Sequence, residues 1–176
     1  LDEANKRRKE LQEDLIKEAR EMLSPYQAGE AIVLYQPHWH EGVIGIAAGR
    51  LSEDYQVPVL LMCQKKGEKI ITGSARSIPG VHIYKALRET GLYLKKYGGH
   101  AGAAGFSLDL DQLINFRREI KKSLTAELVK VERRIAVDGE LSLDQISLED
   151  YYALRKLAPF GEGNPAPKFV SYSTEV

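Results

Sequence analysis

A run of small residues, Gly98-Gly99-His100-Ala101-Gly102-Ala103-Ala104-Gly105, is the stretch of this sequence best suited to hold a ligand. Glycine and alanine carry little or no side chain, so the backbone there can approach a phosphate or a base, and its N–H groups can surround an anion. His100 is the one polar side chain in the run and can donate to a phosphate. A structural interpretation remains open, in which Gly98 and Gly99 only cap a preceding helix.

An arginine between two hydroxyl groups forms the second candidate, in Gly73-Ser74-Ala75-Arg76-Ser77. The segment falls at the end of an expected strand, where α/β sheets tend to place ligands. A guanidinium fork beside hydroxyl donors suits a terminal phosphate, because it can form two charge-assisted hydrogen bonds. On the residues alone, the plainer interpretation is a surface arginine beside turn serines.

Two histidines and a glutamate precede an expected helix in His38-Trp39-His40-Glu41-Gly42. Histidines two residues apart in a loop, with no third ligand at a usual spacing, are a weak metal signal, so we expect no metal site. The sequence contains no Gly-x-Ser-x-Gly, no His-Glu-x-x-His and no clustered carboxylates of a two-metal centre. We therefore expect no catalytic residues in this chain, apart from an assisting role for His100.

Composition and charge narrow the class of protein. Lys+Arg and Asp+Glu are 25 each, so the net charge is zero, which argues against a broad nucleic-acid-coating surface but not against a local pocket. The single cysteine, Cys63, lies in an apolar run and is expected to be a buried, inert thiol of a reducing cytoplasm. No apolar stretch is long enough to span a bilayer, so we expect a cytoplasmic protein without membrane contact.

The elements that must position these residues alternate along the chain. Leu1–Leu23 lacks glycine and proline and follows a helical stripe, which packs either on its own domain or on a missing upstream partner. The following expected elements are strand 31–35, helix 42–55, strand 57–63, returning strand 69–76, helix 82–97, a strand near 106–108 and helix 113–128. This order predicts an α/β domain with a mixed sheet layered with helices.

The last part of the chain differs in pattern. Arg133–Leu141 indicates a strand, Ser147–Leu157 a helix and Phe169–Tyr172 the start of another strand. The segment between the last two, Pro159-Phe160-Gly161-Glu162-Gly163-Asn164-Pro165, is rich in turn residues. Two expected strands are too few to close a barrel or a sandwich, so the segment is an incomplete β domain.

Several of these segments together resemble the DHH phosphoesterase superfamily. Gly98–Gly105 resembles the Gly-Gly-His-x-x-Ala-Ala-Gly motif of the DHH-associated domain, the second domain of those enzymes. His40–Arg50 and Gly73–Ser77 are similar to their counterparts in the RecJ branch, although that branch often has His-Pro-Gly where this chain has His40-Glu41-Gly42. Leu157–Pro165 is similar to the RecJ segment that opens an oligonucleotide-binding (OB) fold, and Leu1–Leu23 to the helix that joins the two phosphoesterase domains.

This resemblance implies a division into an interdomain connector helix (residues 1–24), a DHH-associated substrate-binding domain (25–130) and an incomplete OB-fold segment (131–176). It implies the substrate-binding portion of an enzyme that degrades single-stranded DNA from its 5′ end in repair and recombination. In such enzymes Mn²⁺ or Mg²⁺ is held by a preceding domain, so this chain alone is expected to be inactive and to bind no metal. Single-stranded DNA is the implied partner, with helicases or single-strand-binding proteins as further ones.

The resemblance also assigns roles to particular residues. Ser74 and Arg76 match the positions that receive a 5′-terminal phosphate. The residues expected to line the substrate cleft are Gly98, Gly99, His100, Ala103 and Ala104, and further candidates for substrate contact are His40, Arg50 and Ser77.

Two alternatives stay open at this point. The first is an oligonucleotide or cyclic-dinucleotide phosphodiesterase of the same superfamily, and the second is a non-catalytic nucleic-acid or tRNA-binding module of the kind found with alanyl-tRNA synthetases. The tail with Pro159–Pro165 argues against the first, because such phosphodiesterases usually end soon after the motif domain. The segment Gly73–Ser77 argues against the second.

Overall fold

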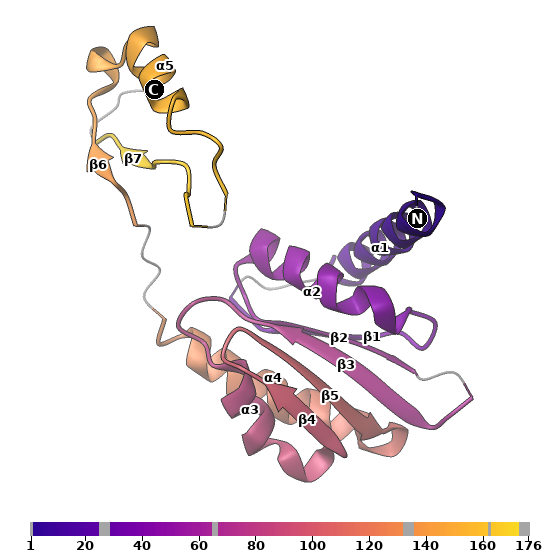
Figure 1. Ribbon diagram of the computed structural model, residues 1–176. Coiled ribbons are helices and arrows are strands. Elements are labelled where there is room, and N and C mark those ends of the chain that lie inside the picture. Colours follow the sequence, from indigo (N-terminus) through magenta and orange to yellow (C-terminus); the bar gives the residue numbers. More distant parts are fainter. Residues whose placement is uncertain (1, 25–28, 65–66, 132–135, 162, 173–176) are drawn as a thin grey trace. The chain divides into compact units, whose positions relative to one another are not determined.

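A computed structural model describes the chain except for residues 1, 25–28, 65–66, 132–135, 162 and 173–176 (Figure 1). The chain forms two compact units, Leu1–Val131 and Glu132–Val176. None of the described helices is long and apolar enough to cross a membrane.

The first unit is built on a five-stranded mixed sheet in the order β1-β2-β3-β5-β4. The strands are β1 (Ile32–Tyr35), β2 (Val59–Gln64), β3 (Ile70–Arg76), β4 (Lys96–Gly99) and β5 (Ala103–Asp109). β1 and β2 run parallel, while β2–β3, β3–β5 and β5–β4 are antiparallel pairs. The predicted α/β class with a mixed sheet is confirmed.

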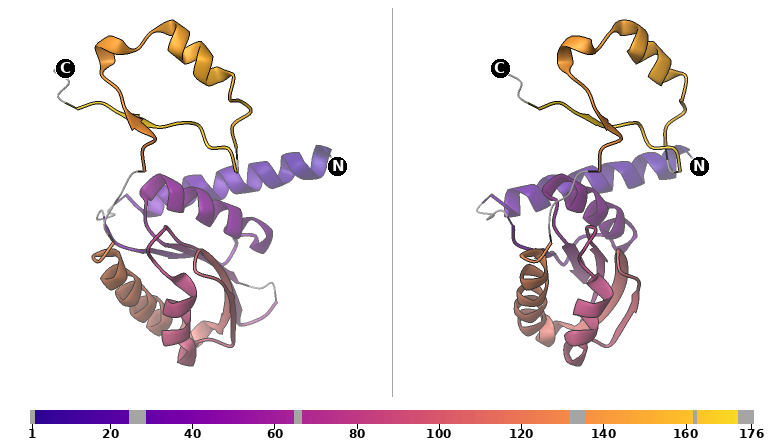
Figure 2. Two further views of the ribbon diagram at one scale, coloured as in Figure 1. Left: turned by 60° about the vertical axis from the view of Figure 1, so that its left-hand side comes forward. Right: turned by 90° about the vertical axis from the view of Figure 1, so that its left-hand side faces the viewer.

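Helices cover this sheet on two sides (Figures 1 and 2). α1 (Asp2–Met22) and α2 (Glu41–Tyr55) lie on one side, and α3 (Ile83–Glu89) and α4 (Leu113–Leu128) lie on the other. The side chains of β2 are buried on both faces, with Leu60 in the core toward α3 and α4 and Leu61 in the core toward α2. This double burial explains why β2 is an uninterrupted apolar run, as expected for a central strand.

Only the second half of α1 packs on the unit. Leu15 and Ala19 are buried against α2, and Arg20 forms an ion pair of 2.7 Å with Asp54 of that helix. Glu18 accepts hydrogen bonds from the Trp39 indole at 2.8 Å and from His38 at 2.9 Å. The helix predicted over Leu1–Leu23 is confirmed within the described residues, and the second half of its apolar stripe packs on its own unit.

The helix predicted over residues 82–97 is wrong in its second half. α3 ends at Glu89, where the Thr90 hydroxyl donates to the carbonyls of Ala86 and Leu87, and Gly91 follows. Tyr97 belongs instead to strand β4, paired with Phe106. The spacing of three and four residues that suggested a helix continues past α3 because Leu94, after a short helical turn, and Tyr97, in β4, pack on the same side of the sheet as α3.

The second unit contains a two-stranded parallel sheet of β6 (Gly139–Glu140) and β7 (Phe169–Val170), and the helix α5 (Leu148–Arg155). Both strands are shorter than the sequence predicts, and residues 133–135 of the first lie outside the described part. A capping box begins α5, in which Ser147 Oγ donates to the Asp150 carboxylate and accepts from its backbone N–H. The Ser147 hydrogen bonds, first from the side chain and then from the backbone, lower the pKa of Asp150.

Cys63 lies on β2 with 1% of its surface exposed. Burial, and then the negative charge of Glu41, raise the pKa of its thiol from 9.0 to about 11. The folded protein should therefore resist DTNB at pH 8, whereas the unfolded protein in guanidinium should react within the mixing time, because only the thiolate is nucleophilic. Because the unfolded thiol ionises first, the free energy of unfolding should also fall as the pH rises from 9 to 11.

The Cys63→Ala variant is the control, because its unfolding free energy should fall less over that pH range. Labelling of the native protein as fast as that of the unfolded protein would contradict the burial of this thiol.

Candidate functional site

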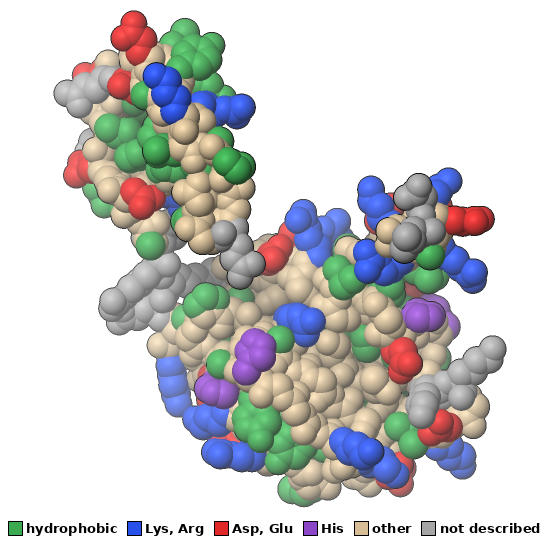
Figure 3. Space-filling model, in the orientation of Figure 1, with side chains coloured by type: hydrophobic (Ala, Val, Ile, Leu, Met, Phe, Trp, Pro, Cys, Tyr) green, Lys and Arg blue, Asp and Glu red, His purple; other side chains and the backbone are tan. Residues whose placement is uncertain are grey.

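Strands β3, β5 and β4 present one face of the sheet that α2 does not cover. Ile71 and Ala75 of β3 point into the core with α3 and α4, so the alternate residues point to the other side. The paired residues of β5 and β4 continue this arrangement. We call the resulting surface the open sheet face; its residues are Thr72, Ser74, Arg76, Lys96, Gly98, Ala103, Gly105 and Ser107. Figure 3 shows a broad tan surface over these strands, because hydroxyl groups, glycine and backbone predominate there.

Ser74 and Arg76 lie where α2 meets this face. Arg76 Nη1 donates to Ser74 Oγ at 3.2 Å and to the Ala75 carbonyl at 2.9 Å, which fixes the guanidinium beside the hydroxyl. A Cβ atom on Gly45 of α2 would lie 3.1 Å from Ser74 Oγ and 3.2 Å from Arg76 Nη2. The missing side chain of Gly45 therefore makes room for the two groups, and they form one cationic, hydrogen-bonding corner.

The glycine-rich run is a β-hairpin rather than a helix cap. Gly98 and Gly99 belong to β4, Ala103–Gly105 to β5, and the His100 N–H donates to the Ala103 carbonyl at 2.8 Å across the turn. Gly99 has φ +143°, and a Cβ atom there would lie 2.3 Å from the Ala103 oxygen. A Cβ atom on Gly98 would meet nothing within 4 Å. Gly99 is thus required by the hairpin itself, whereas Gly98 leaves free surface.

His100 is exposed in the turn of this hairpin. The Gly102 N–H donates to its Nδ1 at 3.2 Å, so the neutral ring carries its proton on Nε2. The Nε2–H can donate to an anion in solvent, as the sequence suggested, and the Nδ1 contact orients the ring.

The register between β3 and β5 brings the two sequence motifs together. Arg76 is directly opposite Ala103, and the Ser77 N–H donates to the Gly102 carbonyl at 2.9 Å. The Ser77 hydroxyl donates to the Val81 carbonyl, so it fixes the loop that follows β3. Ala104 is the exception, because its side chain is buried in the core on the opposite face.

His40 lies away from the Ser74–Arg76 corner, and Arg50 is engaged by another residue of its own helix. His40 caps α2 by accepting from the Gly42 N–H at 3.0 Å. It also lines a pocket of about 560 Å³ with Cys63, at the C-terminal end of β2, whereas Arg76 pairs with Val59 at the start of that strand. The Arg50 side chain forms an ion pair with Asp54 of its own helix, so both residues have structural partners.

The sequence reasoning missed several residues of the open sheet face. They are Thr72, Lys96, Gly105 and Ser107, together with Gly45 of α2. A period of two along Ile70–Arg76 could have indicated Thr72. The strand that holds Lys96 was mistaken for a helix, so no periodicity could place it.

No group of three or more His, Cys, Asp or Glu side chains that could hold a metal ion occurs among the described residues.

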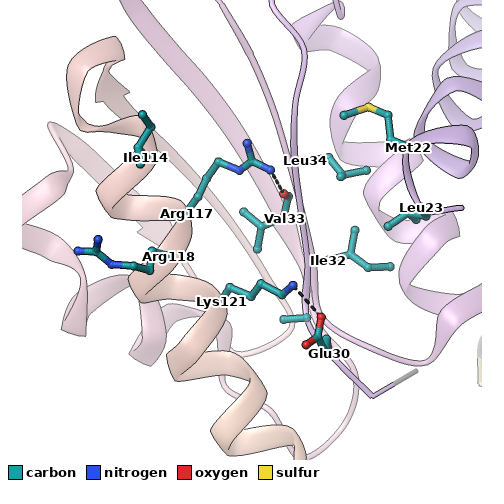
Figure 4. Close-up of a pocket in the computed structure, with 11 residues that line it drawn as sticks. Met22, Leu23, Glu30, Ile32, Val33, Leu34, Ile114, Arg117, Arg118 and Lys121 are labelled. Atoms are coloured by element: carbon teal, nitrogen blue, oxygen red, sulfur yellow. Dashed lines mark hydrogen bonds and ion pairs between the residues drawn. The ribbon is translucent and has the colours of Figure 1, made fainter. Parts of the chain in front are cut away.

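A separate pocket of about 450 Å³ lies at the other edge of the sheet, beside β1 (Figure 4). Arg117 of α4 donates to the Val33 carbonyl at 3.1 Å, and Lys121 pairs with Glu30 at 2.7 Å. These cations cover part of an exposed strand edge, which is a common protection of such edges. The pocket contains none of the site residues that the sequence indicated.

Comparison with protein families shows which family this chain belongs to. Residues 28–126 match the DHHA1 domain, and residues 137–176 match the RecJ OB domain. The chain belongs to the DHHA1 domain family. In this chain the DHHA1 domain is followed by a RecJ OB domain, as the resemblance of the motifs implied.

Curated relatives agree with this assignment. The chain is 33% identical to the single-stranded-DNA-specific exonuclease RecJ of Haemophilus influenzae, over 96% of this chain and 31% of the relative. It is also 33% identical to RecJ of Thermus thermophilus, over 98% of this chain and 24% of the relative. The chain thus spans about a third or less of the length of these relatives.

Solved structures show the same fold. RecJ of Thermus thermophilus in complex with Mg²⁺ has a TM-score of 0.73 and 31% identity, covering 93% of this chain and 25% of that chain. Exonuclease RecJ bound to manganese has a TM-score of 0.61 and 32% identity, covering 73% of this chain and 32% of that chain.

The two adjacent glycines of β4 provide a matched pair of substitutions. Gly99→Ala should reduce the free energy of unfolding by about 2–4 kcal/mol, because the new methyl group meets the Ala103 backbone at a positive φ. Gly98→Ala should leave stability unchanged or raise it by about 0.5 kcal/mol, since its methyl group meets free space in a strand. Urea denaturation measures both. Equal losses in the two variants would contradict the hairpin geometry.

Proposed function

We propose that this chain is the substrate-binding region of an exonuclease that degrades single-stranded DNA from its 5′ end. The observation that carries the proposal is the β3–β5 register, which sets the Ser74–Arg76 corner beside the Gly98–Gly105 hairpin on the open sheet face. The name of the RecJ relatives, single-stranded-DNA-specific exonuclease, supports the same substrate.

The 5′-terminal phosphate would bind at Arg76 and Ser74. A guanidinium offers paired N–H donors to phosphate oxygens, and its charge strengthens each bond. Ser74 Oγ lies 3.2 Å from Arg76 Nη1, so the two can grip one phosphate together. His100 would donate from Nε2 to the strand at the nearby hairpin, and Gly98 and Gly105 would let the backbone of the strand lie against the sheet.

In the longer protein, the hydrolysis would be performed by another domain that holds Mn²⁺ or Mg²⁺, the ions named for the solved relatives. We propose that residues 1–24 connect that domain to the DHHA1 domain of residues 25–130, and that residues 131–176 belong to an OB fold that extends the contact with single-stranded DNA. The protein would act in DNA repair and recombination in the cytoplasm. Helicases or single-strand-binding proteins would be its protein partners.

The zero net charge fits one wall of a cleft better than an autonomous DNA-binding protein. The long-range electrostatic attraction to phosphates that dominates most DNA affinity is small for this chain. The chain alone should therefore bind DNA weakly, with its preference concentrated at the 5′ end.

Arg76 is the residue that tests this preference. The chain should bind a 5′-phosphorylated trinucleotide more tightly than its 5′-hydroxyl counterpart, and Arg76→Ala should remove most of the difference. A lost charge-assisted contact is worth about 1.5–3 kcal/mol, or about 10- to 150-fold in affinity. Arg118→Ala, at an exposed ion pair on α4, is the matched control and should retain the preference. Calorimetry or NMR titration measures these affinities.

Equal losses for phosphorylated and hydroxyl ends in the Arg76→Ala variant would contradict the assignment of a phosphate site. The same samples, incubated with single-stranded DNA and Mn²⁺, should show no nuclease activity, and robust activity would contradict the proposed division of labour. A preference for cyclic dinucleotides or tRNA over single-stranded DNA would favour the alternative functions.

A further inference from the structure

An aromatic pair lies at the edge strand β4, on the side of the sheet opposite the open sheet face. Tyr97 of β4 and Tyr84 of α3 have ring centroids 5.8 Å apart and planes inclined by 45°. Tyr97 is 38% exposed although its neighbours on the same sheet face, such as Phe106, are buried. Figure 3 shows hydrophobic side chains at the surface between α3 and β4, beside the histidines. Packing in the core therefore leaves part of the surface of these rings exposed to solvent.

The aromatic pair is tied to the hairpin of the proposed site. The Ile83 N–H at the start of α3 donates to the Ala101 carbonyl at 3.0 Å, which holds the first turn of α3 against the hairpin turn. Tyr97 directly precedes Gly98 and Gly99, and β4 is the strand at one edge of the sheet. Since the two glycines carry no side chains, a ligand on the open sheet face can pass over this edge and reach the rings.

Two cations are close in sequence to the aromatic residues. Arg88 lies one helical turn after Tyr84 on α3, and Lys96 directly precedes Tyr97. Both side chains are exposed, and within the described part of the chain neither has an anionic partner. In contrast, the neighbouring Lys85 and Lys95 are paired with Glu127 and Asp109. Arg88 on the side of α3, and Lys96 on the open sheet face, therefore remain available to phosphates on the two sides of the β4 edge.

We infer that Tyr97 and Tyr84 form a stacking platform for a base of single-stranded nucleic acid, downstream of the nucleotide whose 5′-phosphate is bound at Arg76. Exposed aromatic rings flanked by cations are the usual means of binding single strands without sequence preference. This inference rests on the proposed function and adds a second contact to it.

The separation of the two contacts sets the length of strand required. β4 lies two strands from β3, about 10 Å across the sheet. Tyr97 is also displaced along the strands, because its partner Phe106 is paired with Gly73, three residues before Arg76. A strand that follows this path must also turn over the edge at Gly98 and Gly99. A trinucleotide therefore reaches Arg76 without a base on the tyrosines, whereas a dodecamer reaches both.

The test is the length dependence of binding in Tyr97 variants. Tyr97→Ala should weaken binding of a 5′-phosphorylated dT12 about tenfold and leave a 5′-phosphorylated dT3 unchanged. Tyr97→Phe, which keeps the ring, should bind both as the parent chain does. Tyr97→Leu keeps apolar contact with Tyr84 and removes the ring, so it should lose affinity for dT12 as the alanine variant does. Melting temperatures show that each variant is folded.

A spectroscopic readout separates stacking from general loss of affinity. A 2-aminopurine placed at successive positions of the dodecamer should be quenched at an internal position in the parent chain and in Tyr97→Phe, and not in Tyr97→Leu. Folded Tyr97→Ala and Tyr97→Leu variants that bind dT12 with the parent affinity would overturn the inference. The proposed function would still stand in that case if dT3 shows the Arg76-dependent preference for a 5′-phosphate, so the two failures are distinct.

Discussion

The antiparallel register of β3 against β5 is the constraint on which the site depends. A slip of one residue would exchange the two faces of β3, so that Arg76 would enter the core and Ala75 would take its place. The register is secured by Phe106, whose ring lies over Gly73 and contacts Phe116 with centroids 5.1 Å apart. A Cβ atom on Gly73 would lie 2.2 Å from that ring, so only glycine permits this packing. The same contact that builds the core thus orients the Ser74–Arg76 corner.

The glycines of the site have two different physical roles. Gly73 and Gly99 are required by the fold, because added side chains would collide with Phe106 and with the backbone of β5. Gly98 and Gly105 have open space or only ordinary contacts around them, so packing does not require them. Because these glycines leave the sheet face free of side chains, a ligand could lie flat against the backbone there.

The sequence was sufficient for much of the fold, because long segments carried consistent periodicity. Leu113–Leu128 is an example, since its apolar residues fall on one helical face and become the buried residues of α4. The short strand β4 could not be found in this way. Its four residues are all exposed and two are glycine, so neither alternation nor β-propensity marks them.

The candidate site was predictable as separate motifs and not as a surface. Arg76 and the Gly98–Gly105 run could each be singled out by composition, but their adjacency depends on a pairing between strands that are 27 residues apart at Arg76 and Ala103. Ala104 belongs to the same run, yet period-two alternation turns its side chain into the core. Residues such as Thr72 and Ser107 become visible as site candidates only when the register is known.

The most direct measurement of the central claim is the mapping of backbone amide shifts during titration with 5′-phosphorylated dT3. We expect the largest changes on the open sheet face, at Ser74, Arg76, Gly98 and Gly105, with little change around Val33 and Arg117 at the opposite edge. Changes concentrated at that opposite edge, or none at Ser74 and Arg76 at saturating ligand, would contradict it.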